Sequence, residues 1–283
     1  MAWSERDQKV YDELIEWENK LLSYQPNDFE LTYEKYIEKT FLLLPDDIQA
    51  RFFALMDGWL FHLHALIQGT QFQMDAKDRI LSAGQMFDPQ IESISDLRNL
   101  EIDKIKYIVQ QQVSRHRFYS FAQGGLSGTG GAILLGSDLP AMVVINLRAV
   151  QLIAMSSGFE VNTPFEMMTS LKVFHIASLP PRLQMAGWQE LKNELNDSQD
   201  YFFEGNEKLT DVSWIEQPLK QILKVLAILA FRRKFLQGIP LISMAIGAGS
   251  NYYFTRNVTD FAQHYYQMRY LLEKEQSNLL NGE

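Results

Sequence analysis

The sequence predicts an all-α protein, a multi-helix bundle with two glycine-rich helical hairpins packed at its centre. Three observations favour this class. Apolar residues recur at helical spacing, several segments open with good capping residues, and no stretch has the alternating pattern of a strand. A chain of 283 residues can bury a sizeable core and form one large domain or two. We place a boundary between an N-terminal helical region, residues 1–92, and a helical domain with a glycine-rich core, residues 93–283.

Composition argues against several classes of function. The formal net charge of −9 is unfavourable for a general binder of nucleic acids or anionic membranes, although charge is not uniform along the chain. The absence of cysteine excludes disulfides and thiolate metal sites. The N-terminal segment is too charged for a signal peptide, and no apolar run looks like a convincing transmembrane span. We therefore expect a cytoplasmic protein.

The first helix is expected to begin near the N-terminus. Ser4 and Asp7 have the spacing of an acidic capping arrangement. Val10, Leu14 and Trp17 follow at helical spacing, so the helix is amphipathic with one apolar face.

Two further helices are expected at residues 27–44 and 45–68. The second of these carries His62 and His64, which are the first pair to test as metal ligands. Residues two positions apart point to different sides of a helix, so this pair cannot readily share one ion. We interpret both as packing or surface histidines.

A charged helix is expected over residues 94–117, after shorter helical pieces near residues 76–87. It would end with Arg115, His116 and Arg117, which places cations at the negative end of the helix dipole. The ordinary interpretation is a solvated cap. The alternative is contact with lipid headgroups or with an acidic partner.

The segment 122–158 is the stretch around which the chain is organised. Beginning just before this segment, small residues recur at every fourth position: Ser120, Gly124, Gly128, Ala132 and Gly136. This is a glycine zipper pattern, which lets the backbone of another helix approach closely. Six of the thirteen residues in 124–136 are glycine. Each costs about 1 kcal/mol in a helix relative to alanine. The segment is therefore either a tightly packed helix or a loop.

Known glycine motifs do not fit this segment. A P-loop beginning at Gly125 needs Lys where Gly131 stands, and the dinucleotide-binding fingerprint needs Gly where Ile133 stands. The nucleophile elbow of serine hydrolases fails at Thr129. The glycines therefore indicate packing rather than nucleotide or serine-hydrolase chemistry.

A break is expected at residues 137–140, where Pro140 fits the first turn of a new helix. The segment 122–158 then forms the first hairpin. Asp138 and Arg148 are its charged residues. The ordinary interpretation is a capping aspartate and an arginine that reaches the surface. The alternative is a partly buried polar pair on a binding surface.

Thr163 and Glu166 form a capping box with Pro164 at the first helical position, and the prolines at 180–181 end the helix. Residues 193–211 are polar and acidic, which is typical of a mobile connection.

Ser213 and Glu216 open another helix, which ends in the basic group Arg232-Arg233-Lys234. Residues 235–255 then carry no charge and repeat the small-residue spacing, for example at Ser243 and Gly247. We interpret them as the second glycine-rich hairpin.

The last helix has a clear apolar stripe that predicts a buried face, made of Phe254, Val258, Phe261, Tyr265, Met268 and Leu272. Arg256, Asp260 and His264 form the opposite, polar stripe. The spacing of Arg256 and Asp260 predicts an i, i+4 ion pair. His264 as a catalytic base would need a nucleophile nearby, and the sequence marks none.

The order of these elements resembles the EcsC family of bacterial proteins. The resemblance covers roughly residues 100–269 and rests on Gly-Gly-Leu-Ser-Gly-Thr-Gly-Gly at 124–131, Asp138-Leu139-Pro140, the helix with Arg148 that leads to Gly158-Phe159-Glu160, and Gly238-Ile239-Pro240 with Gly247, Asn251 and Arg256. The family takes its name from a protein encoded beside an ABC transporter. The resemblance implies a helical architecture and a link to the membrane or a transporter, but no reaction and no catalytic residues.

Our first hypothesis is a non-enzymatic accessory protein at the cytoplasmic face of the membrane or in a membrane transporter complex, using the charge-poor segments and their basic flanks. The second is a hydrolase-like enzyme with a polar site around Asp138, Arg148, Asn251, Arg256 and Asp260. The third is a soluble homo-oligomeric scaffold. No nucleic-acid partner, catalytic residue, metal or cofactor is assigned. The residues singled out as a functional or structural motif are Gly124, Gly125, Gly128, Gly131, Asp138, Pro140, Arg148, Gly158, Gly238, Pro240, Gly247, Asn251, Arg256 and Asp260.

Overall fold

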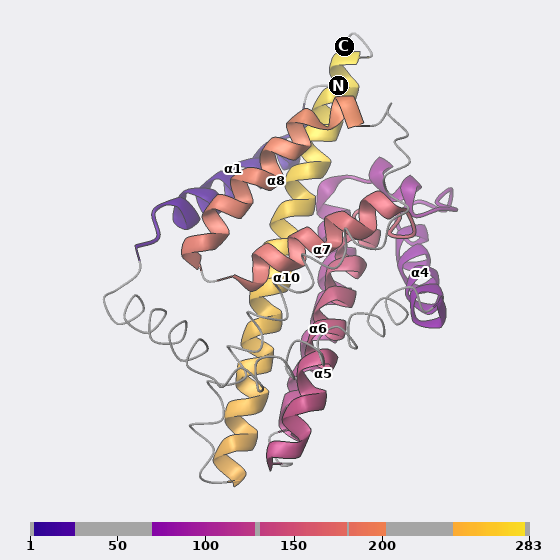
Figure 1. Cartoon of the computed structure of the whole chain (residues 1–283). Helices are drawn as coiled ribbons and strands as arrows, with labels where there is room; N and C mark the ends of the chain where they lie inside the picture. Colours follow the sequence, from indigo (N-terminus) through magenta and orange to yellow (C-terminus); the bar gives the residue numbers. More distant parts are fainter. Residues whose placement is uncertain (1–2, 26–69, 128–130, 180, 202–239, 281–283) are drawn as a thin grey trace.

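The computed structural model describes residues 3–25, 70–127, 131–179, 181–201 and 240–280. These residues form seven α-helices and one 3₁₀-helix, with no strand among them (Figure 1). The predicted all-α class is therefore confirmed. The helices expected at 27–44, at 45–68 and after Ser213 lie outside the described residues, as do His62, His64 and the basic group 232–234.

The helices keep the labels of Figure 1. Their bounds are α1 Glu5–Leu22, α4 Thr70–Gln85, η1 Ser95–Asn99, α5 Ile102–Ser127, α6 Gly131–Ser156, α7 Pro164–Ser178, α8 Pro181–Tyr201 and α10 Pro240–Leu280. With 41 residues, α10 is the longest described helix and packs against α1, α5, α6 and α7. It runs through the middle of the bundle, with α5 and α6 on one side and α1 and α8 across its upper half (Figure 1).

The N-terminal helix begins with the predicted capping box. The Ser4 hydroxyl accepts from the Asp7 amide at 3.2 Å, and the Asp7 carboxylate accepts from the Ser4 amide at 2.9 Å. The same buried carboxylate accepts from the Lys274 ammonium at 2.7 Å, which joins the start of α1 to the end of α10. Burial alone would raise the pKa of Asp7, but Lys274 and Ser4 together hold it below its ordinary value.

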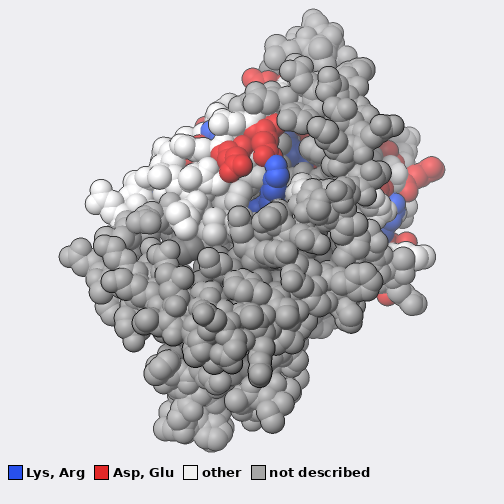
Figure 2. All heavy atoms as spheres, in the orientation of Figure 1, with Lys and Arg blue, Asp and Glu red and all other residues white. Residues whose placement is uncertain are grey.

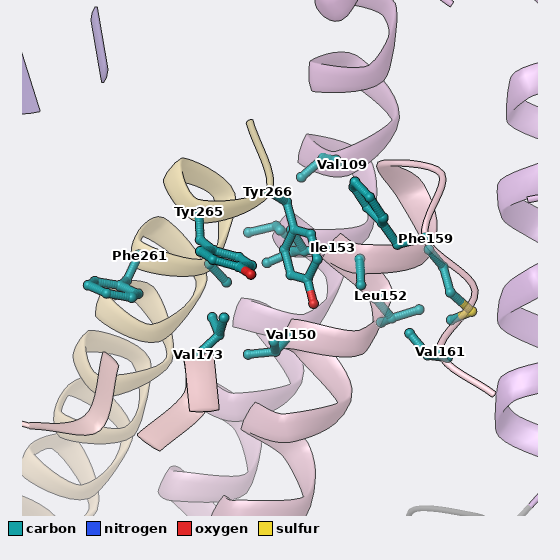
Figure 3. Close-up of a cluster of buried hydrophobic side chains, with 14 of the residues drawn as sticks. Val109, Val150, Leu152, Ile153, Phe159, Val161, Val173, Phe261, Tyr265 and Tyr266 are labelled. Carbon is teal, nitrogen blue, oxygen red and sulfur yellow. The ribbon is translucent and has the colours of Figure 1, made fainter. Parts of the chain in front are cut away.

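The described core lies where α5, α6 and α10 meet. Figure 3 shows Val109 of α5, Val150 and Ile153 of α6, and Tyr265 and Tyr266 of α10 gathered in one cluster. The predicted stripe on the last helix is confirmed, because Val258, Phe261, Tyr265 and Met268 are buried while Phe254 and Leu272 are partly buried. Side chains of 123–141 and 240–250 lie outside the described part, so a central position for the glycine-rich hairpins stays a prediction.

Four predicted boundaries are wrong. The charged helix expected from residue 94 begins only at Ile102, because residues 95–99 form the separate 3₁₀-helix η1. The α5 helix continues to Ser127, so Arg115–Arg117 do not end a helix. The α6 helix runs through residues 137–140 without the expected break, and α8 continues to Tyr201, through the first part of the expected connection at 193–211. Pro140 removes one backbone hydrogen bond from α6. The buried run that follows, from Met142 to Met155, shows that tertiary packing and not the local signal decides this helix.

Gly158 ends α6 in a Schellman motif. The Gly158 amide donates to the Met155 carbonyl and the Phe159 amide to the Ala154 carbonyl, each at 3.0 Å. Gly158 has a φ of +89°, and a Cβ added there would lie 2.5 Å from Arg98 Cγ and 3.1 Å from the Arg98 amide nitrogen. This glycine is therefore required both by the backbone conformation and by the close approach of η1.

Replacing Gly158 with valine is expected to lower the free energy of unfolding by about 3 kcal/mol, because a β-branched side chain is strained at positive φ and also clashes with Arg98. The measurement is denaturant unfolding. Ala186→Val places the same β-branched side chain at an exposed position of α8 and is expected to change stability by less than about 0.7 kcal/mol. Equal stability of the two variants would contradict the role assigned to Gly158.

Candidate functional site

A polar contact joins α5 to α10 below the apolar core. The Ser120 hydroxyl lies 2.6 Å from the Thr255 hydroxyl and donates to the Asn251 carbonyl oxygen at 3.1 Å. Ser120, Asn251 and Thr255 are all buried. Buried hydroxyls need partners, so this contact fixes the register of the two helices. Ser120 belongs to the predicted glycine zipper. Its contact with Thr255 of α10 could not be predicted from sequence spacing.

One turn closer to the core, Arg117 of α5 reaches across to the same face of α10. Its guanidinium group donates to the Thr259 hydroxyl at 2.7 and 2.9 Å and to the Asp260 carboxylate at 2.5 Å. Asp260 also lies 3.6 Å from the Arg256 guanidinium group, which confirms the predicted i, i+4 ion pair. The Asp260 carboxylate therefore pairs with two arginines, and the side chain of Arg117 is more buried than that of Arg256.

His264 contacts both its own helix and α1. Its Nδ1 lies 2.6 Å from the Asp260 carbonyl oxygen, which can only accept, so Nδ1 carries the hydrogen. The imidazole ring stacks on Trp17 of α1, with ring centroids 4.2 Å apart and planes 6° apart. Burial holds the pKa of His264 below its ordinary value. The ring therefore helps to fasten α1 to α10.

The predicted motif residues are distributed over several elements. Gly124 and Gly125 lie in α5, Gly131, Asp138, Pro140 and Arg148 in α6, and Pro240, Gly247, Asn251, Arg256 and Asp260 in α10. Gly128 and Gly238 lie outside the described residues, as do the surroundings of the Asp138 side chain. Of the five residues proposed for an enzyme site, Asn251, Arg256 and Asp260 lie on the same helix, α10, where Arg256 pairs with Asp260. The partners described for Asn251 and Asp260 across the helix interface are Ser120 and Arg117 of α5. Convergence with Asp138 stays a prediction.

A second polar group lies inside the fold and is not indicated by sequence spacing. The buried guanidinium group of Arg269 pairs with the buried Glu166 carboxylate and, at 2.8 Å, with Glu273. It also lies over the Phe159 ring, 3.9 Å from the centroid, and Arg98 lies over the same ring at 4.3 Å. Phe159 therefore has both cation–π contacts and the apolar neighbours shown in Figure 3.

The charges in this group depend on each other. Burial raises the pKa of Glu166, and the nearby Arg269 opposes that shift. Burial would lower the pKa of Arg269, but Glu166 and Glu273 raise it above its ordinary value. Arg98 completes the group by donating to the Gly158 carbonyl oxygen at 2.8 Å and pairing with Glu273 at 3.2 Å. The arrangement is suited to holding η1, α7 and α10 together through the loop after α6, and its charged groups are already paired.

The outer face of α5 carries exposed aromatic side chains next to a basic residue. Phe118 is 67% exposed and Tyr119 is 52% exposed, and Arg115 on the preceding turn is exposed as well. Tyr253 on α10 is 65% exposed. Thr255, two residues further, contacts Ser120 of α5, so these rings belong to neighbouring stretches of the two helices.

Between Arg115 and Arg117, the His116 side chain points inward and is 6% exposed. Burial, followed by the charges of Arg148, Arg79 and Arg115, lowers the pKa of His116 to about 4. Of the expected basic group at 115–117, Arg115 is therefore exposed, His116 is buried and neutral, and Arg117 is paired across the interface.

Within the described ranges, no three His, Asp or Glu side chains are placed to hold a metal ion. The helices of those ranges include none that is both long and apolar enough to cross a membrane.

The fold and these contacts can be compared with known proteins. The chain belongs to the EcsC protein family, whose model matches residues 8–271 and so includes most of the N-terminal region as well as the glycine-rich part. It is similar to the uncharacterized protein YdbA of Bacillus subtilis (strain 168), with 23% identity over 282 residues and 96% of each chain covered. No solved structure matches the chain. The division of the chain at residue 92 stays a prediction.

The position of His116 predicts how stability depends on pH. The folded state favours the neutral ring with a pKa of about 4, and the unfolded chain has the ordinary value near 6.5. The contribution of the neutral His116 ring to the stability of the folded state is therefore complete above pH 6.5 and is lost as the pH falls towards 4. Compared with His116→Gln, the wild type should lose roughly 3 kcal/mol of unfolding free energy over this range. Denaturant titrations at several pH values test this, and parallel pH profiles would contradict it.

Proposed function

We propose that this EcsC family protein is a non-enzymatic accessory protein that binds reversibly to the cytoplasmic face of a membrane through the outer face of α5. The observation that carries the proposal is the exposure of Phe118 and Tyr119 beside Arg115. Aromatic rings favour the headgroup region of a membrane, where the apolar ring is buried and a tyrosine hydroxyl remains hydrated. An adjacent guanidinium group adds attraction to anionic lipids.

The expected strength of this contact is modest. Burying one large apolar side chain contributes about 1.5–3 kcal/mol, and one cation near an anionic surface contributes about 1 kcal/mol. Two rings and one arginine would therefore support binding that is reversible and sensitive to salt. The exposed Tyr253 and the exposed Arg256 of α10 would add further contact if this part of α10 also reaches the surface.

The described charged surface in Figure 2 is less suited to anionic lipid. On the face shown in Figure 2, the described basic and acidic side chains lie next to each other. Exposed pairs such as Lys172 with Glu194, at 2.5 Å, neutralise each other. A surface with both signs has little net attraction for an anionic membrane.

The direct test is flotation with vesicles of phosphatidylethanolamine and phosphatidylglycerol. The double variant Phe118→Ser/Tyr119→Ser should reduce vesicle binding about ten-fold or more, because two rings no longer enter the headgroup region. Met74→Ser/Met86→Ser is the matched control, since it removes two apolar side chains that are 64% and 80% exposed outside α5. This control should bind like the wild type.

Two results would contradict the proposal. One is a wild-type protein that stays entirely free of vesicles. The other is an equal loss of vesicle binding in the α5 variant and in the methionine control, which would indicate non-specific hydrophobic adsorption rather than binding through a defined surface.

A further inference from the structure

Helix α1 packs against α5, α8 and α10 and is joined to all three by ion pairs (Figure 1). Three of its carboxylates each pair with a lysine of a different helix: Asp7 with Lys274 of α10 at 2.7 Å, Glu13 with Lys106 of α5 at 2.9 Å, and Glu18 with Lys192 of α8 at 2.9 Å. Near the start of α1 the signs are reversed, because Arg6 pairs with Glu101 and, at 3.1 Å, with Asp103. The face under α1 is therefore basic along most of its length and acidic at one end.

The apolar part of this contact is small. Of the buried residues of α1, two are apolar, Val10 and Leu14, and the other two are the paired carboxylates at positions 7 and 18. The partly buried Trp17 contacts an aromatic floor, made of Trp188 of α8 and Phe261 of α10, with ring centroids 4.8 and 5.7 Å apart. Surface ion pairs add little stability and are screened by salt, so α1 is weakly attached compared with the core helices.

The contact also leaves buried polar atoms without a partner. Trp188 Nε1 is buried and donates to no acceptor in the described structure, although Trp17 packs against its ring. The same holds for Asp7 Oδ1, because the bonds from Ser4 and Lys274 all reach the other oxygen, Oδ2. A buried polar atom without a partner opposes the packing that buries it. Helix α1 therefore does not satisfy every polar atom of the face it covers.

We propose that the face under α1 is a docking site for an acidic amphipathic helix of a partner protein, and that α1 is its displaceable cover. The occupant follows from charge complementarity, since lysines from three helices lie around an aromatic floor. Helix α1 itself meets them with six acidic and three basic side chains. This inference goes beyond the membrane proposal and does not depend on Phe118 or Tyr119.

The pairs made by α1 define what such a partner helix needs. It has a basic residue at the position of Arg6, and acidic residues one, seven and twelve positions further on. An aromatic residue takes the position of Trp17. An anionic membrane is less suited to this face, because Glu101 and Asp103 at one end would repel it.

The probe for this site is a fluorescently labelled peptide of residues 1–24, and its affinity for the full chain is measured by anisotropy. Glu13→Lys/Glu18→Lys in the full chain turns two attractive pairs into repulsive ones and should release α1 from the face. Asp12→Lys/Glu16→Lys is the matched control. It changes the charge of α1 equally, at residues whose described bonds, to Gln8 and Lys20, stay within that helix.

The wild-type chain and the control chain should bind the peptide weakly, because their own α1 occupies the site. The Glu13→Lys/Glu18→Lys chain should bind it about ten-fold or more tightly, since the site is open for a larger fraction of the time. A peptide that itself carries Glu13→Lys/Glu18→Lys should bind none of these chains, because its lysines would face Lys106 and Lys192.

Hydrogen exchange of the wild type at rising NaCl concentration is a second measurement, which does not depend on how a variant folds. Exchange of the α1 amides should accelerate with salt while the amides of α10 from residue 258 to 271 stay protected, because salt screens the ion pairs and not the core.

Three results would overturn the proposal. One is a Glu13→Lys/Glu18→Lys chain that binds the peptide no more tightly than the control chain. Another is exchange of α1 and α10 together at every salt concentration, which would show that α1 does not leave on its own. The third is a gain in affinity for anionic vesicles without a gain for the peptide, which would indicate a lipid surface instead.

Discussion

The contact between α5 and α10 is the interaction on which the rest of the described structure depends. At one end, the Tyr270 hydroxyl donates to the Leu100 carbonyl oxygen, just before α5, at 2.8 Å. At the other, the Ser120 hydroxyl meets Thr255 at 2.6 Å, and the apolar core shown in Figure 3 lies between. Polar contacts at both ends of an apolar interface specify its register, because sliding either helix would leave buried hydroxyls without partners. That register places Arg117 against Asp260.

Buried charge adds specificity at the other side of α10. Arg269 and Glu166 are removed from water, and the attraction between them must offset a large desolvation penalty. Such a pair adds little net stability compared with an apolar packing, but it disfavours any arrangement in which one partner is buried alone. Together with Gly158, which allows η1 to approach the end of α6, it determines where α7 lies against α10.

Local signals in the sequence predicted local structure well. The capping box at Ser4, the apolar stripe of the last helix and the Arg256–Asp260 pair depend on residues three or four positions apart, and the structure contains all of them. Of the capping box predicted at Thr163, the structure has the bond from the Glu166 amide to the Thr163 hydroxyl, while the Glu166 carboxylate pairs with Arg269 instead. The site contacts could not be predicted in this way, since Arg117 and Thr259 are 142 residues apart. The break expected at residues 137–140 is wrong for the same reason: the packing of distant helices on α6 outweighs the local effect of Pro140. The glycine zipper contact stays a prediction.

The most direct test of the α5–α10 register is a cross-link between its two buried hydroxyl positions. The chain has no cysteine, so within one chain a disulfide in Ser120→Cys/Thr255→Cys can join only these two residues. Because the two hydroxyl oxygens are 2.6 Å apart, mild oxidation should form the bond within one chain almost completely, with a mass loss of two hydrogens. Ser114→Cys/Thr255→Cys, with the first cysteine on the exposed face of α5, should stay reduced. A Ser120/Thr255 pair that stays reduced, or that links only separate chains, would contradict the register.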